Sequence, residues 1–203
     1  SGKGGTGKTT VAVSLARVLG SGVQLLDCDV EEPNDRLFLD GRLREAQVVT
    51  VPVPRVDEVA CDGCGECGRF CRFHAIVAVD GPPLVFPELC HGCGGCIRVC
   101  PRGALHETPR RIGVVEVLDA GPVTLVEGRL DVGAALVPPL VRAVKAHRAG
   151  DRLAILDAPP GRSCAVIETL RGADAVVLVT EPTPFGLNDL AQALEVAREL
   201  GLP

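Results

Sequence analysis

The sequence predicts an α/β fold, a doubly wound parallel sheet into which a small α+β domain is inserted. Three observations predict it. A glycine-rich loop at residues 1–10 leads into an apolar helix pattern, apolar strand patterns end in carboxylates, and eight of the ten cysteines fall between residues 61 and 100. Alternating strands and helices are typical of a parallel sheet that binds ligands at the carboxyl ends of its strands.

The composition is that of a soluble globular chain: 46% of the 203 residues are hydrophobic and 23% are charged. The net charge of −5 gives no reason to expect nucleic acid as a partner. No apolar run approaches the ~18 residues of a membrane span. The chain has no methionine and opens on the glycine-rich loop, without the strand that such a loop normally follows. We therefore expect a fragment whose sheet is incomplete.

Apolar periodicity and end signals place the elements in order along the chain. Continuous Val, Leu and Ile runs suit parallel strands that are covered on both faces. We expect helices over Lys8 to Leu19, Val137 to Ala149 and Asn188 to Leu200, and strands over Gln24 to Asp29, Ile112 to Leu118, Leu153 to Asp157 and Val176 to Thr183.

Eight cysteines form two runs with one spacing, C-x2-C-x2-C-x3-C, offset by 29 residues. This duplicated run resembles the bacterial two-cluster ferredoxins. In that family the fourth cysteine of each run binds the cluster of the other run. The resemblance implies one [4Fe–4S] cluster on Cys61, Cys64, Cys67 and Cys100 and a second on Cys90, Cys93, Cys96 and Cys71.

Other interpretations of the cysteines remain. Arg72 stands where the family has a proline after the fourth cysteine, which removes no ligand. Paired C-x2-C segments can also build a zinc site, although zinc needs only four ligands. Disulfides between such close neighbours are geometrically poor. Cys28 and Cys164 have no ligand spacing and are expected to be small buried residues. Reduced clusters imply a cytoplasmic location.

The loop at residues 1–10 matches two phosphate-binding patterns. A dinucleotide fingerprint fits its glycines, with Asp27 as the ribose-binding acid, but leaves the lysine and threonines unexplained. The Walker A pattern explains them, because its lysine neutralises β- and γ-phosphate charge and its hydroxyl binds Mg²⁺. We therefore expect ATP with Mg²⁺, with Thr9 as the Mg²⁺ ligand and the phosphates bound by Gly4, Gly5, Thr6, Gly7, Lys8, Thr9 and Thr10.

An additional lysine, Lys3, makes this loop similar to the deviant Walker A loop of the MinD/ParA/Mrp ATPases. In that family the early lysine reaches the partner's nucleotide across a dimer interface. The resemblance implies a homodimer, or a dimer with a paralogue, that closes when ATP is bound. It gives Lys3 and Lys8 catalytic roles.

Three further segments resemble the same family and occur in its order. In the first switch segment, Asp29 would orient the attacking water and Asp27 would lie near the magnesium shell. Asp157 would hold the Mg²⁺ waters at the second switch, and Glu181 and Pro182 resemble the family's nucleotide-side loop.

The cysteine block interrupts the ATPase pattern. We expect residues 1–55 and 110–203 to form a discontinuous P-loop ATPase domain and residues 57–108 to form the inserted ferredoxin domain. The whole chain resembles the MinD-superfamily ATPases that carry such an insert.

These resemblances imply an Mg²⁺-dependent ATPase in which closure of the dimer gates electron transfer through two [4Fe–4S] clusters. An Mrp-like carrier that delivers clusters to other proteins is the alternative, and a MinD-like positioning ATPase is a further one. The expected protein partner is a redox protein or a protein that accepts a cluster.

Overall fold

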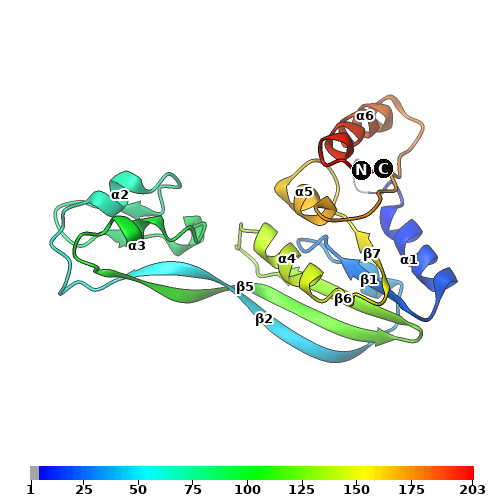
Figure 1. The fold of residues 1–203 in the computed structure, drawn as a ribbon, viewed down its shortest axis with the longest axis horizontal. Helices are drawn as coiled ribbons and strands as arrows, with labels where there is room; N and C mark the ends of the chain where they lie inside the picture. Colours follow the sequence, from blue (N-terminus) through cyan, green and yellow to red (C-terminus); the bar gives the residue numbers. More distant parts are fainter. Residues whose placement is uncertain (1–4) are drawn as a thin grey trace. The chain divides into compact units, whose positions relative to one another are not determined.

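The computed structural model describes residues 5–203, which divide into two compact units. The first unit contains the described residues up to Val48, together with Gly113–Leu130 and Val137–Pro203. The second contains Val49–Ile112 and Asp131–Leu136. It is therefore wider than the insert expected at residues 57–108. Two long strands, β2 (Arg42–Val56) and β5 (Leu105–Ala120), continue from one unit into the other along the chain (Figure 1).

The first unit is built on a five-stranded sheet in the order β2-β5-β6-β1-β7. Strand β1 runs parallel to both of its neighbours, β6 and β7. Besides β2 and β5, the elements of this unit are α1 (Lys8–Leu19), β1 (Val23–Asp27), η1 (Asp35–Leu37), β6 (Val123–Leu130), α4 (Pro138–Ala146), β7 (Leu153–Asp157), α5 (Cys164–Leu170) and α6 (Pro184–Glu199).

Helices α1 and α4 cover opposite faces of this sheet. Leu25 of β1 belongs to the apolar core that α1 forms with Val13 and Ala16. The preceding residue, Gln24, points to the other face, because side chains alternate along a strand. There its side chain bonds the backbone of His147 and Ala149, just after α4. The sheet is therefore doubly wound, as the sequence predicts.

The sheet is mixed: it is parallel around β1, as the sequence predicts, but not at β5. Strands β5 and β6 pair antiparallel, with Ala120 opposite Val123. Gly121, at a φ of 63°, permits the tight turn between them. The expected strand at Ile112 is the central part of the longer β5. The predicted strands include neither β2, which charged residues and prolines interrupt, nor β6, which contains Glu127 and Arg129.

The strand expected over Val176 to Thr183 is wrong. No strand is assigned to residues 175–182, and the sheet ends at β7. A strand requires ladder hydrogen bonds to a neighbour, whereas the backbone N–H of Val176 bonds the carbonyl of Pro203. Helix α1 has the expected ends. Helix α4 ends three residues early, and α6 begins four residues early, where Thr183 caps it by accepting a bond from Gly186 N–H.

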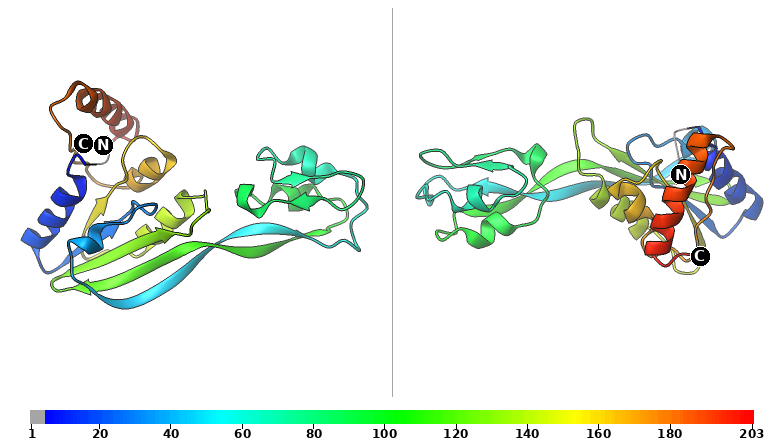
Figure 2. Two further views of the ribbon diagram at one scale, coloured as in Figure 1. Left: turned by 180° about the vertical axis from the view of Figure 1, so that it is seen from behind. Right: turned by 90° about the horizontal axis from the view of Figure 1, so that it is seen from above.

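The second unit is small and has a duplicated arrangement. Its two short helices lie side by side in Figures 1 and 2, and its core contains cysteines from both runs together with Ile76 and Leu105. Apart from its parts of β2 and β5, its elements are α2 (Glu66–Phe70), β3 (Ile76–Val77), β4 (Leu84–Val85), η2 (Pro87–Leu89) and α3 (Gly95–Val99), with β3 and β4 antiparallel.

Candidate functional site

The glycine-rich loop leads directly into α1. Gly5 and Gly7 have φ values of 102° and 88°, a conformation that side chains other than glycine rarely adopt, and the helix begins at Lys8. The buried hydroxyl of Thr6 has no hydrogen-bond partner within residues 5–203. Lys8 is half-buried and Thr10 is exposed. Lys3 and Gly4, which the sequence also assigns to this loop, lie outside the described residues.

Thr9 and Asp157 meet at the start of α1 and the end of β7. The Thr9 hydroxyl donates a 2.6 Å hydrogen bond to Oδ2 of Asp157. Burial raises the pKa of Asp157, while this hydrogen bond and the nearby charge of Lys8 oppose the rise. The sequence-predicted magnesium ligand and the carboxylate predicted to hold its waters are therefore neighbours, at the carboxyl end of a parallel strand.

Asp27 organises the loop that follows β1. Its carboxylate accepts hydrogen bonds from the backbone N–H groups of Asp29, Asn34 and Asp35, at 3.0, 2.9 and 3.1 Å. Burial is the main reason that its pKa rises to about 7, and the charge of Asp157 adds to it. Asp27 thus fixes the course of residues 29–35 from the end of the strand.

Asp29 is half-buried near the same carboxylates. Burial raises its pKa to about 6, against a backbone hydrogen bond from Glu32, and the charge of Asp157 raises it further. A carboxylate with a pKa near the working pH can accept a proton from water. This is the property that the predicted role of Asp29 requires.

The structure adds Asp35, which sequence analysis did not single out. Asp35 is fully buried, and its carboxyl group lies beside the carboxylates of Asp27 and Asp157. Burial raises its pKa to about 10, with the charges of Asp27 and Asp157 adding to the effect. In the sequence it follows a run of acidic residues that resembles a solvated loop, so no local pattern reveals its burial.

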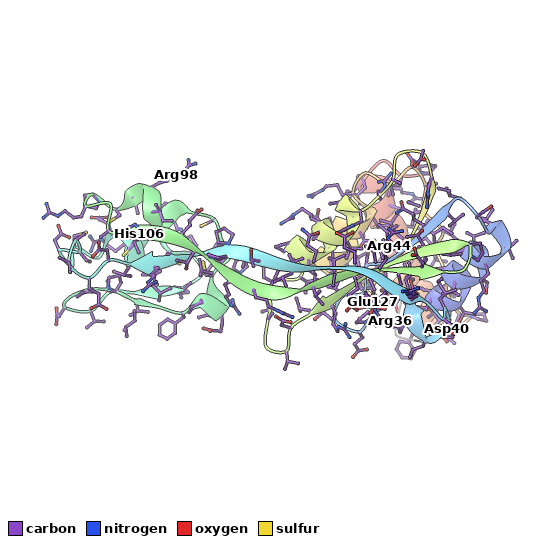
Figure 3. The ribbon with its side chains drawn as sticks, turned by 90° about the horizontal axis from the view of Figure 1, so that it is seen from below. Arg36, Asp40, Arg44, Arg98, His106 and Glu127 are labelled. Carbon is purple, nitrogen blue, oxygen red and sulfur yellow. The ribbon has the colours of Figure 1, made fainter. Side chains whose placement is uncertain are left out.

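A charge network adjoins this site (Figure 3). Arg36, next to Asp35, donates a 2.6 Å hydrogen bond to Glu116 of β5 and lies 3.6 Å from Glu127 of β6. Arg129 binds the same Glu116 oxygen at 2.7 Å. Glu127 is only 3% exposed, and burial raises its pKa despite the two arginines. It is opposite both Asp27 and Glu116 in the strand register, so a row of carboxylates crosses the sheet.

Glu181 and Pro182 lie in the exposed loop before α6. Gly186 packs closely against this loop, since a Cβ there would lie 2.3 Å from the Glu181 carbonyl oxygen.

The eight clustered cysteines line two separate pockets of the second unit. The first pocket contains Cys61, Cys64, Cys67 and Cys100, with Asp62 and Arg102 at its wall. The second pocket contains Cys71, Cys90, Cys93 and Cys96, with Phe73 and His91 at its wall. The structure therefore brings together the two sets of four that the ferredoxin resemblance implies.

Corresponding cysteines of the two pockets have similar burial and similar backbone geometry around them. Cys67 and Cys96 are buried, at 7% and 8% exposure, and burial raises both pKa values, that of Cys96 to about 11. Gly65 and Gly94 precede α2 and α3 with φ values of 75° and 69°. The duplication thus extends to the backbone.

Four thiols in one pocket fit the donor set of a [4Fe–4S] cluster, in which each thiolate binds a different iron. Within residues 5–203, no three His, Cys, Asp or Glu side chains converge closely enough to hold a single metal ion. A cubane does not require that convergence.

The two remaining cysteines differ from each other. Cys28 is fully buried, as predicted, and burial raises the pKa of its thiol. Cys164 is exposed at the start of α5, so the expectation that it is buried is wrong. No helix among residues 5–203 is long and apolar enough to cross a membrane.

Comparison with known proteins identifies the nucleotide-binding part. The family model described as the CobQ/CobB/MinD/ParA nucleotide binding domain matches residues 1–203. The uncharacterized protein MJ0578 of Methanocaldococcus jannaschii is 33% identical over 201 residues, which cover 96% of this chain and 70% of that protein. MJ0579 of the same organism is 29% identical over 213 residues, with 100% and 75% coverage.

The family match agrees with the geometry described above, in which a glycine-rich loop, a helix start and the carboxylates of two parallel strands meet at one edge of the sheet. The chain belongs to the CobQ/CobB/MinD/ParA family of nucleotide-binding domains.

Proposed function

We propose that this chain is an ATP-hydrolysing iron–sulfur protein in which nucleotide binding gates electron transfer. The observation that carries the proposal is that each pocket of the second unit is lined by four cysteines in a chain whose first unit has a MinD/ParA-type nucleotide-binding domain. Bound [4Fe–4S] clusters would supply one-electron chemistry.

The first unit would bind Mg-ATP through Lys8 and Thr9. Lys8 would neutralise phosphate charge, and Thr9 would bind Mg²⁺ through its oxygen while its hydroxyl hydrogen still bonds Asp157. Asp29, whose pKa is about 6, would orient the attacking water and accept its proton. These steps need positioning and charge stabilisation, and no covalent intermediate.

The effect of nucleotide binding would be transmitted along the chain through the loop that follows β1. Asp27 holds residues 29–35, and Arg36 then binds Glu116, which lies on the same strand, β5, that continues into the second unit. A coupling of about 1–3 kcal/mol corresponds to roughly 40–130 mV in a one-electron potential. That range is sufficient to gate electron delivery.

The active form would be a homodimer or a dimer with a paralogue, closed over ATP by Lys3, acting in the cytoplasm with a redox protein as partner. Two relatives of this chain occur together in one organism, which is the situation that a paired dimer requires.

A titration of the clusters tests the gating. The reduction potentials of the full chain are measured anaerobically with and without Mg²⁺ and a non-hydrolysable ATP analogue. We expect the analogue to shift the potentials in the wild type and to shift nothing in Lys8→Ala, which lacks the phosphate-binding ammonium. Identical potentials with and without the analogue in the wild type would refute gating.

A cluster carrier is the second candidate, and the exposure of Cys64 and Cys93 favours it, because a transferred cluster must be reached by new ligands. Transfer of iron to an apo-protein faster than the clusters decay would support the carrier over the electron-transfer protein.

A further inference from the structure

The two halves of the second unit correspond at an offset of 29 residues, so each position has a counterpart. The residue after the first cysteine of a run is Asp62 in one half and His91 in the other. The residue two positions after the fourth cysteine is Phe73 in one half and Arg102 in the other. Because the fourth cysteine of each run lines the opposite pocket, Asp62 and Arg102 both line the first pocket, while Phe73 and His91 line the second.

Each of these pairs is in contact, but the chemistry differs. Arg102 lies 3.6 Å from the carboxylate of Asp62, with 61% and 41% of their side chains exposed. We call them the polar pair. The rings of Phe73 and His91 are stacked, with centroids 3.8 Å apart and planes at 9°. We call them the aromatic pair. One pocket therefore carries hydrated charges at the same place where the other carries two rings.

A third aromatic ring adds to the difference in polarity between the two pockets. Phe70 also lines the second pocket, and no aromatic residue lines the first. The ring occupies space over Gly95, where an added Cβ would lie 2.1 Å from it. The counterpart of Gly95 in the first half is Glu66, which is exposed and pairs with Arg69. Gly95 therefore leaves space for the Phe70 ring at the second pocket, and the first half has no such space because Glu66 stands at the corresponding position.

Two other influences on a bound cluster, thiol burial and the charge of the wall, are similar in the two pockets. The deepest thiols, Cys67 and Cys96, are buried to the same degree. The polar pair carries one charge of each sign, and the second pocket is likewise lined by one cation and one carboxylate, Arg72 and Glu107. The two pockets differ in the chemistry of the wall, because charged groups retain hydration whereas stacked rings are apolar.

We propose that the polar and aromatic pairs make the two clusters unequal, so that the cluster of the first pocket has the higher reduction potential. The proposal rests on the proposed function, since it requires both clusters. Reduction adds negative charge to a thiolate-bound cluster, and water stabilises added charge. The cluster beside the hydrated charges of Asp62 and Arg102 is therefore reduced first, and the cluster beside the rings of Phe73 and His91 is reduced at a lower potential.

The test is an anaerobic potentiometric titration of the full chain with dithionite, followed by electron paramagnetic resonance. Iron and sulfide are counted first. Phe73→Arg combined with His91→Asp places a polar pair on the second pocket, and Asp62→His combined with Arg102→Phe places an aromatic pair on the first. Phe86→Ala is the matched control, because Phe86 is a comparably exposed ring that lines neither pocket.

We expect two reduction steps in the wild type. Placing the polar pair on the second pocket should raise the lower reduction potential towards the higher one. Placing the aromatic pair on the first pocket should lower the higher reduction potential. Phe86→Ala should change neither potential. In ²H₂O, the cluster reduced first should show the stronger deuterium coupling. Coincident steps in the wild type, or exchanges that leave the steps in place, would overturn the inequality while leaving the clusters intact. Protein that lacks iron and sulfide would refute the clusters themselves, and the inequality with them.

Discussion

The hydroxyl of Thr9 donates a 2.6 Å hydrogen bond to the carboxylate of Asp157, although the two residues are 148 positions apart. Thr9 lies in the first turn of the helix after the phosphate loop, and Asp157 ends the strand next to β1. The bond uses the hydroxyl hydrogen of Thr9, so the lone pairs of its oxygen would remain available to a Mg²⁺ ion.

The contact between Thr9 and Asp157 predicts the effect of replacing the Asp157 carboxylate. Asp157→Asn keeps the size of the side chain and removes the charge that would hold the waters of Mg²⁺. We expect the affinity for Mg²⁺ to fall about 10–100-fold, as for other outer-shell ligands, measured from the Mg²⁺ dependence of ATP hydrolysis at saturating ATP. Asp151→Asn, at an exposed carboxylate before the same strand, is the control and should change nothing. An unaltered Mg²⁺ dependence in Asp157→Asn would remove Asp157 from the site.

The position of Arg36 between Glu116 and Glu127 predicts a stability difference. Arg36→Ala leaves the buried Glu127 with only Arg129 to compensate its charge, and we expect the free energy of unfolding to fall by about 1–3 kcal/mol. Arg44→Ala breaks the exposed pair with Asp119 and should cost less than about 1 kcal/mol. Both are measured by urea unfolding. Adding Glu127→Gln to Arg36→Ala should recover most of the loss, and equal losses for the two single variants would contradict the account.

The carboxylates near the phosphate loop predict how stability depends on pH. The pKa values of Asp27 and Asp35 rise from 3.8 to about 7 and about 10 on folding, so the folded state binds more protons than the unfolded state in that range. Stability of the nucleotide-free chain must then fall as pH rises from about 5 to about 9. Asp35→Asn should lessen this slope and stabilise the chain at the alkaline end by about 1–3 kcal/mol.

Denaturant unfolding at several pH values checks this prediction. Asp40→Asn, at an exposed carboxylate after η1, serves as the control and should keep the slope of the wild type. A slope that is identical in Asp35→Asn and the wild type would show that Asp35 does not hold a proton in the folded state.

The cysteine sets predict which iron is lost on substitution. Cys100→Ser should remove the cluster of the first pocket, and Cys71→Ser that of the second, because each fourth cysteine lines the pocket of the other run. Iron should fall from about eight to about four atoms per chain in each case. Cys164→Ser, at an exposed cysteine outside both pockets, should retain all of it. The outcome is read from iron content and visible absorbance, and retention of iron in the Cys71 and Cys100 variants would exclude the assignment.

The sequence predicted the parts of the structure that depend on local pattern. The phosphate loop and the helix from Lys8 follow from glycines and a hydroxylated helix start, and the strand ending at Asp157 follows from its apolar run. The two cysteine sets required a family resemblance, because spacing alone does not say which cysteine crosses to the other pocket.

The parts that it missed depend on long-range contacts. Burial of Asp35 results from packing against Asp27 and Asp157, which no neighbouring residue signals. The expected strand at Val176 has the right composition, but a strand forms only where a neighbour pairs with it. The stack of Phe73 on His91 joins residues from different cysteine runs, and it becomes visible only when the fold brings the runs together.

The most direct test is to purify the full chain without oxygen and to measure iron, sulfide and ATP hydrolysis on the same sample. The account predicts about eight iron atoms and about eight sulfides per chain, together with Mg²⁺-dependent hydrolysis that Lys8→Ala abolishes. A colourless protein that still hydrolyses ATP would contradict it.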